Sequence, residues 1–462
     1  MSFENSKEFI QSIKTNIDHG HDQELLLALG ELHPADVAEV LDDLSSEHAG
    51  YVYRLLDKEL AADVLIELEE DVREKLMRSL TSREIAEEVI ERMESDDAAD
   101  VIAELPTEKK EQVIAHLEDQ EQASDIIDLL NYEEGTAGAL MAKELMWVNA
   151  NWTVANCIRQ LRKQAEDVEQ IYTIYVVDDK DVLLGRLSLK RLLFSAQSTR
   201  ALVSDIFEDE NLVTVNVQDD EQAVARVMEK YDLVTVPVIN DGGVLVGRIT
   251  IDDVVDVIME EAEKDYQLAS GLAEDVESKD NIWTLTRARL PWLLIGMAGG
   301  LLGAKVIGVF DIEENPMMAL FIPLIAAMGG NVGVQSAAIV VQGLANNSLK
   351  NEQLSAKLLK ELGVGALNGF ICSVLLLGTS YLLDFGYALC LTVSIALFAV
   401  IIFAALFGTF IPLALDKYKI DPALATGPFI TTANDIIGLI IYFSVAQFVA
   451  HNIDPNFLAM AF

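Results

Sequence analysis

The chain has few cysteines and histidines, and few basic residues. Its 462 residues include 3 cysteines and 6 histidines, with 33 lysines and arginines against 75 acidic residues. The cysteines Cys157, Cys372 and Cys390 are scattered and odd in number, which argues against a disulfide framework and fits a reducing cytoplasm. A net charge of −42 attracts cations and repels anions, so it excludes nucleic acid as a partner.

Other familiar features are also missing. The N-terminus Met1–Ile10 has no apolar h-region, so we expect no cleaved signal peptide and expect membrane insertion to depend on later apolar segments. We find no Ser/His/Asp set, Walker loop or metal-hydrolase motif, so the sequence does not favour an enzyme. The charge is concentrated in residues 1–289, with 65 acidic and 27 basic residues, whereas residues 290–462 have ten and six. A strongly acidic part therefore precedes an apolar part.

The first part, residues 1–130, has apolar residues at helical spacing and a motif that recurs about every 25 residues. The copies are Ala35–Val37, Ala62–Val64, Ala99–Val101 and Ser124–Ile126, with a weaker one at Glu84–Val89. The repeat predicts helix pairs stacked into an all-α superhelical N-terminal domain of either hand. Asp96 and Asp100 lie one turn apart within it, and taken alone they are best explained as acids at a helix start.

Residues 131–200 and 201–260 share one plan of helix, β-rich run, turn and β-rich run. We expect the helices at Val154–Gln164 and Ala223–Glu229. The plan predicts two small α/β modules in tandem.

The second module carries Gly247, Thr250 and Asp253 in a Gly-x-x-Thr-x-x-Asp signature, and with it the pair resembles tandem CBS domains. The resemblance implies that these three residues are candidates for binding ATP or another adenine nucleotide, with the aspartate on the ribose. The first module has Arg191 where the signature has aspartate, so we expect at most one nucleotide site.

Residues 252–285 form an acidic connector that begins as a helix. Its charged residues are Asp252, Asp253, Asp256, Glu260, Glu261, Glu263 and Asp265, with Lys264 among them. Two like charges a few ångströms apart repel by ~1 kcal/mol in water and by ~4 kcal/mol at an effective dielectric of 20. A solvated acidic helix is the ordinary interpretation, but the position just before the apolar part favours a lever or plug.

Residues 288–462 are predicted to form a transmembrane domain of five helices, because five apolar segments exceed the ~20 residues needed to cross a bilayer. The segments are Leu290–Phe310, Met317–Ala345, Leu362–Leu383, Tyr387–Leu415 and Leu424–Ala450. Basic residues precede the first segment and occupy alternate loops, at Arg287, Arg289, Lys350, Lys357, Lys360, Lys417 and Lys419. The pattern predicts an integral protein of the cytoplasmic membrane, with the soluble domains in the cytoplasm and the C-terminus outside.

Asp435 lies near the middle of the last apolar segment. A carboxylate there costs roughly 2.5–3.5 kcal/mol on insertion scales, so it persists mainly beside a water-filled path or a cation. Thr431 lies on the same helical face and adds an oxygen. The second segment has a small, polar run that includes Asn331, which suits a cation path or simply close helix packing. An aspartate that is protonated or hydrogen-bonded between helices is the alternative for Asp435.

The whole chain resembles the MgtE family of magnesium transporters. The matching pieces are Leu32–Asp36, Asp96–Asp100, Tyr132–Gly138, the CBS pair, Gly329–Asn331, Gln335, Asp421–Ala423 and Asp435. The resemblance implies a homodimeric Mg²⁺-selective channel whose pore is lined by Asp435, Thr431, Asn331 and Gly427. It also implies closure by cytoplasmic Mg²⁺ at Asp96, Asp97, Asp100, Asp220, Asp232, Asp253, Asp256, Glu261 and Asp265.

The chemistry of Mg²⁺ agrees with this expectation. Mg²⁺ usually keeps several waters and binds through one or two carboxylates, which one aspartate per chain, doubled by a two-fold axis, would supply. A membrane-tethered CBS sensor of nucleotide or metal, without transport, is the alternative function.

Overall fold

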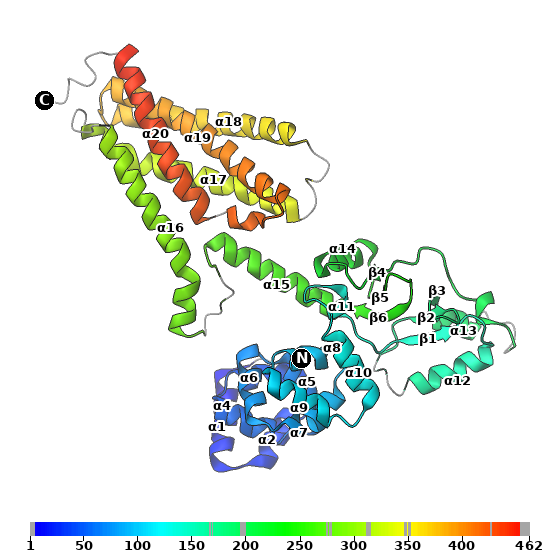
Figure 1. The fold of residues 1–462 in the computed structure, drawn as a ribbon. Helices are drawn as coiled ribbons and strands as arrows, with labels where there is room; N and C mark the ends of the chain where they lie inside the picture. Colours follow the sequence, from blue (N-terminus) through cyan, green and yellow to red (C-terminus); the bar gives the residue numbers. More distant parts are fainter. Residues whose placement is uncertain are drawn as a thin grey trace. The chain divides into compact units, whose positions relative to one another are not determined.

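A computed structural model gives the fold in two compact units, Met1–Met259 and Glu260–Phe462 (Figure 1). It describes residues 5–165, 168, 170–194, 200–273, 276, 280–310, 316–345, 349, 353–425 and 427–452. Lys350, the loop 311–315 and residues 453–462, on which part of the charge argument depends, lie outside the described residues.

The first unit begins with short helices packed around an apolar core. They are α1 (Lys7–His19), α2 (Asp22–Leu29), α3 (Pro34–Asp42), α4 (Ser46–Tyr53), α5 (Lys58–Glu67), α6 (Glu70–Ser79), α7 (Ser82–Glu84), α8 (Ser95–Ala103), α9 (Thr107–His116) and α10 (Gln120–Leu129). The repeated motif falls on α3, α5, α8 and α10, where Val37, Val64, Val101 and Ile126 are buried. Helix α3 packs on α5 and α8 on α10, so the predicted all-α domain of stacked helices is confirmed.

Two three-stranded sheets follow in the same unit. Their elements are α11 (Ala137–Leu140), β1 (Met146–Asn149), α12 (Val154–Gln164), β2 (Ile174–Val177), β3 (Leu183–Leu187), α13 (Leu189–Phe194), β4 (Val215–Asn216), α14 (Glu221–Tyr231), β5 (Thr235–Ile239) and β6 (Leu245–Thr250). In each sheet the first strand is parallel to the second, which is antiparallel to the third. The two α/β modules are confirmed, and each gains a short first strand that the sequence did not indicate.

Helix α15 (Ile251–Ser270) follows β6 directly. Its start is fixed by Asp253, whose carboxylate accepts hydrogen bonds from the Thr250 backbone N–H at 3.1 Å and hydroxyl at 2.7 Å. Its end is marked by Gly271, whose φ of 82° is left-handed. The predicted connector range 252–285 therefore contains one helix end and the start of the next helix.

Within its described residues, the second unit contains five helices long and apolar enough to cross a membrane, as predicted. They are α16 (Ile282–Val309), α17 (Ile322–Ala345), α18 (Leu354–Leu382), α19 (Tyr387–Lys417) and α20 (Pro428–Asn452), with short 3₁₀ turns at Pro316–Phe321 and Pro422–Ala425. Helix α19 is the most buried of the five and packs against α17, α18 and α20.

Four helix starts differ from the predicted segments; α17 begins at Ile322 and not at Met317, because the residues before it form the 3₁₀ turn Pro316–Phe321. Helix α16 begins at Ile282 because Asn281 caps it, accepting from two backbone N–H groups at 3.0 and 3.1 Å. Helix α18 begins at Leu354, so its first lysines belong to the helix instead of a loop. Helix α20 begins at Pro428, after Gly427 with a φ of 55°, because proline suits the first helical position.

Candidate metal sites

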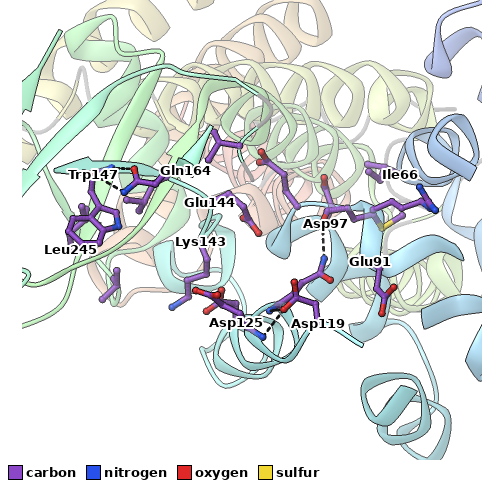
Figure 2. Close-up of a pocket in the computed structure, with 18 of the residues that line it drawn as sticks. Ile66, Glu91, Asp97, Asp119, Asp125, Lys143, Glu144, Trp147, Gln164 and Leu245 are labelled. Carbon is purple, nitrogen blue, oxygen red and sulfur yellow. Dashed lines mark hydrogen bonds between the residues drawn. The ribbon is translucent and has the colours of Figure 1, made fainter. Parts of the chain in front are cut away.

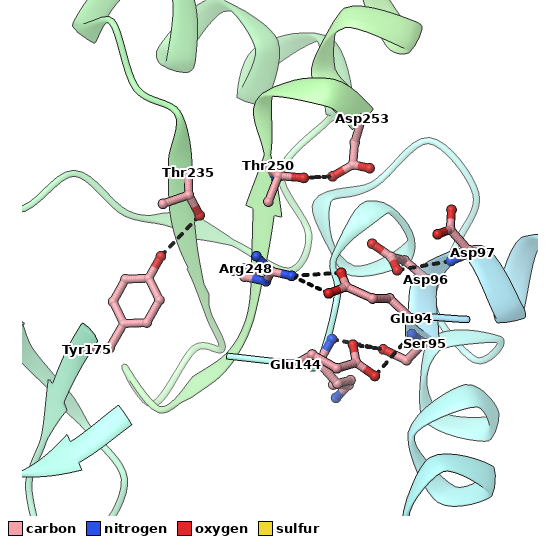
Figure 3. Close-up of polar contacts among 11 residues, drawn as sticks. Glu94, Ser95, Asp96, Asp97, Glu144, Tyr175, Thr235, Arg248, Thr250 and Asp253 are labelled. Carbon is pink, nitrogen blue, oxygen red and sulfur yellow. Dashed lines mark hydrogen bonds and ion pairs between the residues drawn. The ribbon is translucent and has the colours of Figure 1, made fainter. Parts of the chain in front are cut away.

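The helical domain contacts the second CBS module through a buried ion pair. One guanidinium nitrogen of Arg248, on β6, lies 2.8 and 2.7 Å from the two carboxylate oxygens of Glu94, at the start of α8 (Figure 3). Arg248 is only 4% exposed, and its guanidinium also lies over the ring of Tyr172, 5.2 Å from the centroid. A charge this buried needs its partner, so the pair holds the two domains in register.

A second contact beside this ion pair joins α8 to the start of the first CBS module. The carboxylate of Glu144 accepts hydrogen bonds from the Ser95 backbone N–H at 3.1 Å and from its hydroxyl at 2.8 Å. The backbone N–H of Lys143 in turn donates to the Ser95 hydroxyl at 2.9 Å. These bonds fix the first turn of α8, which carries Asp96 and Asp97, against the CBS pair.

Asp96, Asp97 and Asp253 gather at this interface (Figure 3). Burial, followed by the charges of Asp97 and Asp253, raises the pKa of Asp96 well above its usual value. Burial and the charge of Asp253 raise the pKa of Asp97 to about 7. Burial likewise raises the pKa of Asp253, although its hydrogen bonds from Thr250 oppose the shift. Carboxylates that repel one another in this way form a site that a divalent cation would stabilise.

Glu94, Asp96 and Glu144 can each offer an oxygen within 4.8 Å of the others. Asp96 was predicted as a ligand from its motif, whereas the two glutamates were not. Glu94 could have been predicted, because it directly precedes the acidic motif. Nothing local marks Glu144, because its place here depends on the docking of two domains.

An acidic cleft of about 1520 Å³ opens beside this cluster (Figure 2). Eleven acidic and two basic side chains are among the described residues that line it, with Asp97, Asp125 and Glu144 on the helical and CBS sides. Trp147 and neighbouring aliphatic residues complete the lining. The cleft therefore concentrates negative charge next to the interface.

The other predicted regulatory residues are more dispersed. Asp100, on α8, and Asp256, on α15, are exposed. The pKa of Asp256 is still raised, first because neighbouring atoms exclude part of the water around its carboxyl group and second by the charge of Asp252. Asp220 caps the N-terminus of α14 and Asp232 its C-terminus, so a helix of 11 residues, roughly 16 Å long, separates them.

Glu261 and Asp265 lie on the part of α15 that belongs to the second unit. There, burial and then the charges of Glu261 and Asp421 raise the pKa of Asp265.

The predicted nucleotide residues lie close together at the end of β6. A Cβ atom on Gly247 would lie 2.6 Å from the sulfur of Met141, so glycine is required for the chain to pass there. Thr250 and Asp253 are hydrogen-bonded to each other. Nucleotide binding stays a prediction. In the first module Arg191 pairs with Glu208 at 2.7 Å.

In the membrane unit, Asp435 lies where α20 faces α17. A Cβ atom on Gly330 would lie 3.7 Å from a carboxylate oxygen of Asp435 and 3.5 Å from the methyl group of Thr431. The Thr431 hydroxyl donates to the backbone oxygens of Gly427 and Pro428, both at 3.1 Å.

Two further residues complete this region. Asn331 is exposed on α17 beside Gly330, and Asp435 is half-buried. The sequence also missed Glu361, which accepts a hydrogen bond from the Ser336 hydroxyl at 2.6 Å.

Comparisons with known proteins decide the family. Residues 322–445 match the model of MgtE divalent cation transporters, residues 32–135 the MgtE intracellular N domain, and residues 137–197 and 203–260 CBS domains. The magnesium transporter MgtE of Thermus thermophilus is 35% identical over 442 residues, which is 94% of this chain and 97% of the relative. The chain belongs to the MgtE family.

A second relative agrees with this assignment, and one solved structure is similar in sequence. The magnesium transporter MgtE of Bacillus subtilis is 32% identical over 70% of this chain and 72% of its own length. A solved structure titled as the cytosolic domain of the Mg²⁺ channel MgtE in complex with ATP is 35% identical, covers 54% of this chain and 99% of its own, and has a TM-score of 0.48. Membership in the MgtE family and the five apolar helices make this an integral membrane protein with cytoplasmic soluble domains.

Proposed function

We propose that this MgtE-family chain conducts Mg²⁺ across the cytoplasmic membrane into the cell, with Asp435 as the pore carboxylate. The observation that carries the proposal is the position of Asp435: a half-buried carboxylate on an apolar helix, facing a glycine of α17 and one turn from Thr431. Relatives named magnesium transporters support the cargo, and they disfavour a tethered sensor without transport. Mg²⁺ fits because a single carboxylate can hold it while most of its waters remain.

The conducting form in this proposal is a homodimer. Asn331 is a polar side chain exposed on a helix of the membrane unit, beside the glycine that faces Asp435. A second copy would bring another Asp435 and Asn331 to the same axis and give a path lined by oxygens. The alternation of basic residues along the chain supports a C-terminus outside the cell.

Regulation by cytoplasmic Mg²⁺ is the second part of the proposal. Asp96, Asp97 and Asp253 repel one another at the interface of the helical domain and the CBS pair, as their raised pKa values indicate. A bound Mg²⁺ would remove this repulsion and stabilise the docked interface. At low Mg²⁺ the repulsion loosens it, which we take as the signal that opens the channel.

The test is the flux of Mg²⁺ into liposomes that hold the purified protein and a Mg²⁺-sensitive dye. We expect Asp435→Asn to insert normally, since removing a charge eases insertion, and to lose flux. Asp384→Asn is the matched control, because Asp384 lies in a loop with a left-handed φ of 63° that asparagine tolerates. Normal flux through the Asp435 variant would remove that residue from the pore.

A further inference from the structure

Asn434, the neighbour of Asp435 on α20, is the most unusual buried side chain of the membrane unit. It is only 1% exposed, and neither its carboxamide oxygen nor its nitrogen has a hydrogen-bond partner in the described part of the chain. Because Asn434 is enclosed within one chain, neither lipid nor a second subunit can reach the amide. A polar group without a partner is costly in a membrane, so the amide requires a partner inside the bundle.

The amide points into a place where three helices meet at glycines. A Cβ atom on Gly333 of α17 would lie 1.9 Å from the amide nitrogen and 2.7 Å from the Ile430 side chain, so Asn434 occupies the space that any larger residue at 333 would need. A Cβ atom on Gly408 of α19 would lie 2.3 Å from the backbone oxygen of Gly333. The two glycines thus bring α17, α19 and α20 together around the carboxamide.

A second unpaired polar group lies on α19. Thr409 directly follows Gly408 on α19, is 2% exposed, and its hydroxyl likewise has no protein partner in the described residues. A threonine hydroxyl in a helix can usually bond to the carbonyl one turn earlier, as Thr392 does here at 2.8 Å. Thr409 does not, so its hydroxyl is available to a ligand.

We propose that Asn434 and Thr409, with the glycine backbone at their junction, form an internal water-binding site. Both groups can donate and accept hydrogen bonds, which matches a neutral ligand with donors and acceptors of its own. A metal ion fits poorly, because hard cations usually bind through one or two carboxylates and none is among the described residues found at the two glycines. Bound water satisfies the amide and ties α20 to α19.

This site is distinct from the one proposed at Asp435. Consecutive residues of a helix point about 100° apart, so Asn434 faces the glycines of α17 and α19 while Asp435 faces Gly330. The water site goes beyond the proposed function, because it stands whether or not an ion passes Asp435. The bound water fixes the rotation of α20 about its own axis at Asn434, the residue before the Asp435 carboxylate.

X-ray radiolytic footprinting of the full chain in nanodiscs tests the proposal, because radicals formed from bound water label the buried side chains that touch it. Ile430 and Ile401 are both 0% exposed, but only Ile430 borders the proposed site. We expect labelling of Ile430 and none of Ile401. Equal labelling of the two isoleucines would overturn the proposal.

Two variants sharpen the test. Asn434→Leu, or Thr409→Val if the first fails to fold, should remove most labelling of Ile430. The control Asn368→Leu, at an exposed position of α18, should leave it unchanged. Thermal unfolding gives a second readout: if water already satisfies the amide, Asn434→Leu gains little stability. A large rise in melting temperature would show that the amide is unpaired and would overturn the proposal.

Discussion

Replacing Glu94 by glutamine should undock the helical domain from the CBS pair. The change keeps the size of the side chain but leaves the Arg248 guanidinium, 4% exposed, without its counter-charge. Removing one partner of a buried pair costs about 3–5 kcal/mol. The Glu94 side chain is 27% exposed, so water can reach the gap and the lower end applies. About 3 kcal/mol corresponds to a roughly hundredfold weaker docking equilibrium, at 1.4 kcal/mol for each factor of ten.

Amide hydrogen exchange on the full chain, in Mg²⁺, measures this effect. The Lys143 N–H is a direct reporter, because its acceptor, the Ser95 hydroxyl, belongs to the other domain. We expect its exchange to speed up by about the same hundredfold in Glu94→Gln, since exchange follows the opening equilibrium.

The control for this experiment is Glu208→Gln. Glu208 pairs with Arg191 within the CBS pair and not across to the helical domain, and its side chain is 31% exposed, close to the exposure of Glu94. Exchange at Lys143 should not change in this variant. Wild-type exchange in Glu94→Gln as well would mean that the ion pair does not hold the domains together.

Three further predictions follow from the acidic interface and the glycine contacts. The first is a channel variant in which alanine replaces Asp253, Asp256 and Glu261. Its Mg²⁺ flux should persist at Mg²⁺ concentrations that close the wild-type channel. In EDTA the docked interface should weaken as the pH rises from about 4 to 7. The reason is that the pKa of Asp97 is raised to about 7, so in this range the native state holds a proton that the unfolded chain releases. Hydrogen exchange at pH 5 and 7.5 checks the sign of the effect, and saturating Mg²⁺ should remove the difference. Gly333→Ala should destabilise the membrane unit by ~1–3 kcal/mol through overlap with Asn434 and Ile430. Asn434→Ala should restore part of this loss in thermal unfolding, since it relieves the closer of the two overlaps.

The sequence predicted those parts of the fold that depend on periodicity. The apolar segments, the helical repeat and the paired modules all follow from patterns that recur along the chain. The strands β1 and β4 were not predicted, because segments of four and two residues are too short to show an alternation of apolar and polar side chains. Helix starts were misplaced where a local cap such as Asn281 begins the helix well before the apolar segment.

The candidate sites could be predicted only in part, because many of their residues interact with partners that are distant in the sequence. Asp435 is visible as a lone carboxylate in an apolar segment. Glu94 is not, because its partner Arg248 is 154 residues away and nothing near either residue indicates the pair. The burial of Asn434 was equally hidden, since it depends on the glycine at position 333 of another helix.

The acidic cleft has a consequence for the protein inside a cell. Eleven carboxylates facing two basic groups will hold counterions at all times, and these are monovalent when Mg²⁺ is scarce. Entry of one Mg²⁺ is then an exchange that releases two monovalent ions into solution. The apparent affinity for Mg²⁺ at the interface should therefore fall as cytoplasmic potassium rises. The set point of the regulation would thus follow the ratio of the two cations, so a cell under osmotic stress that accumulates potassium would also shift its magnesium threshold.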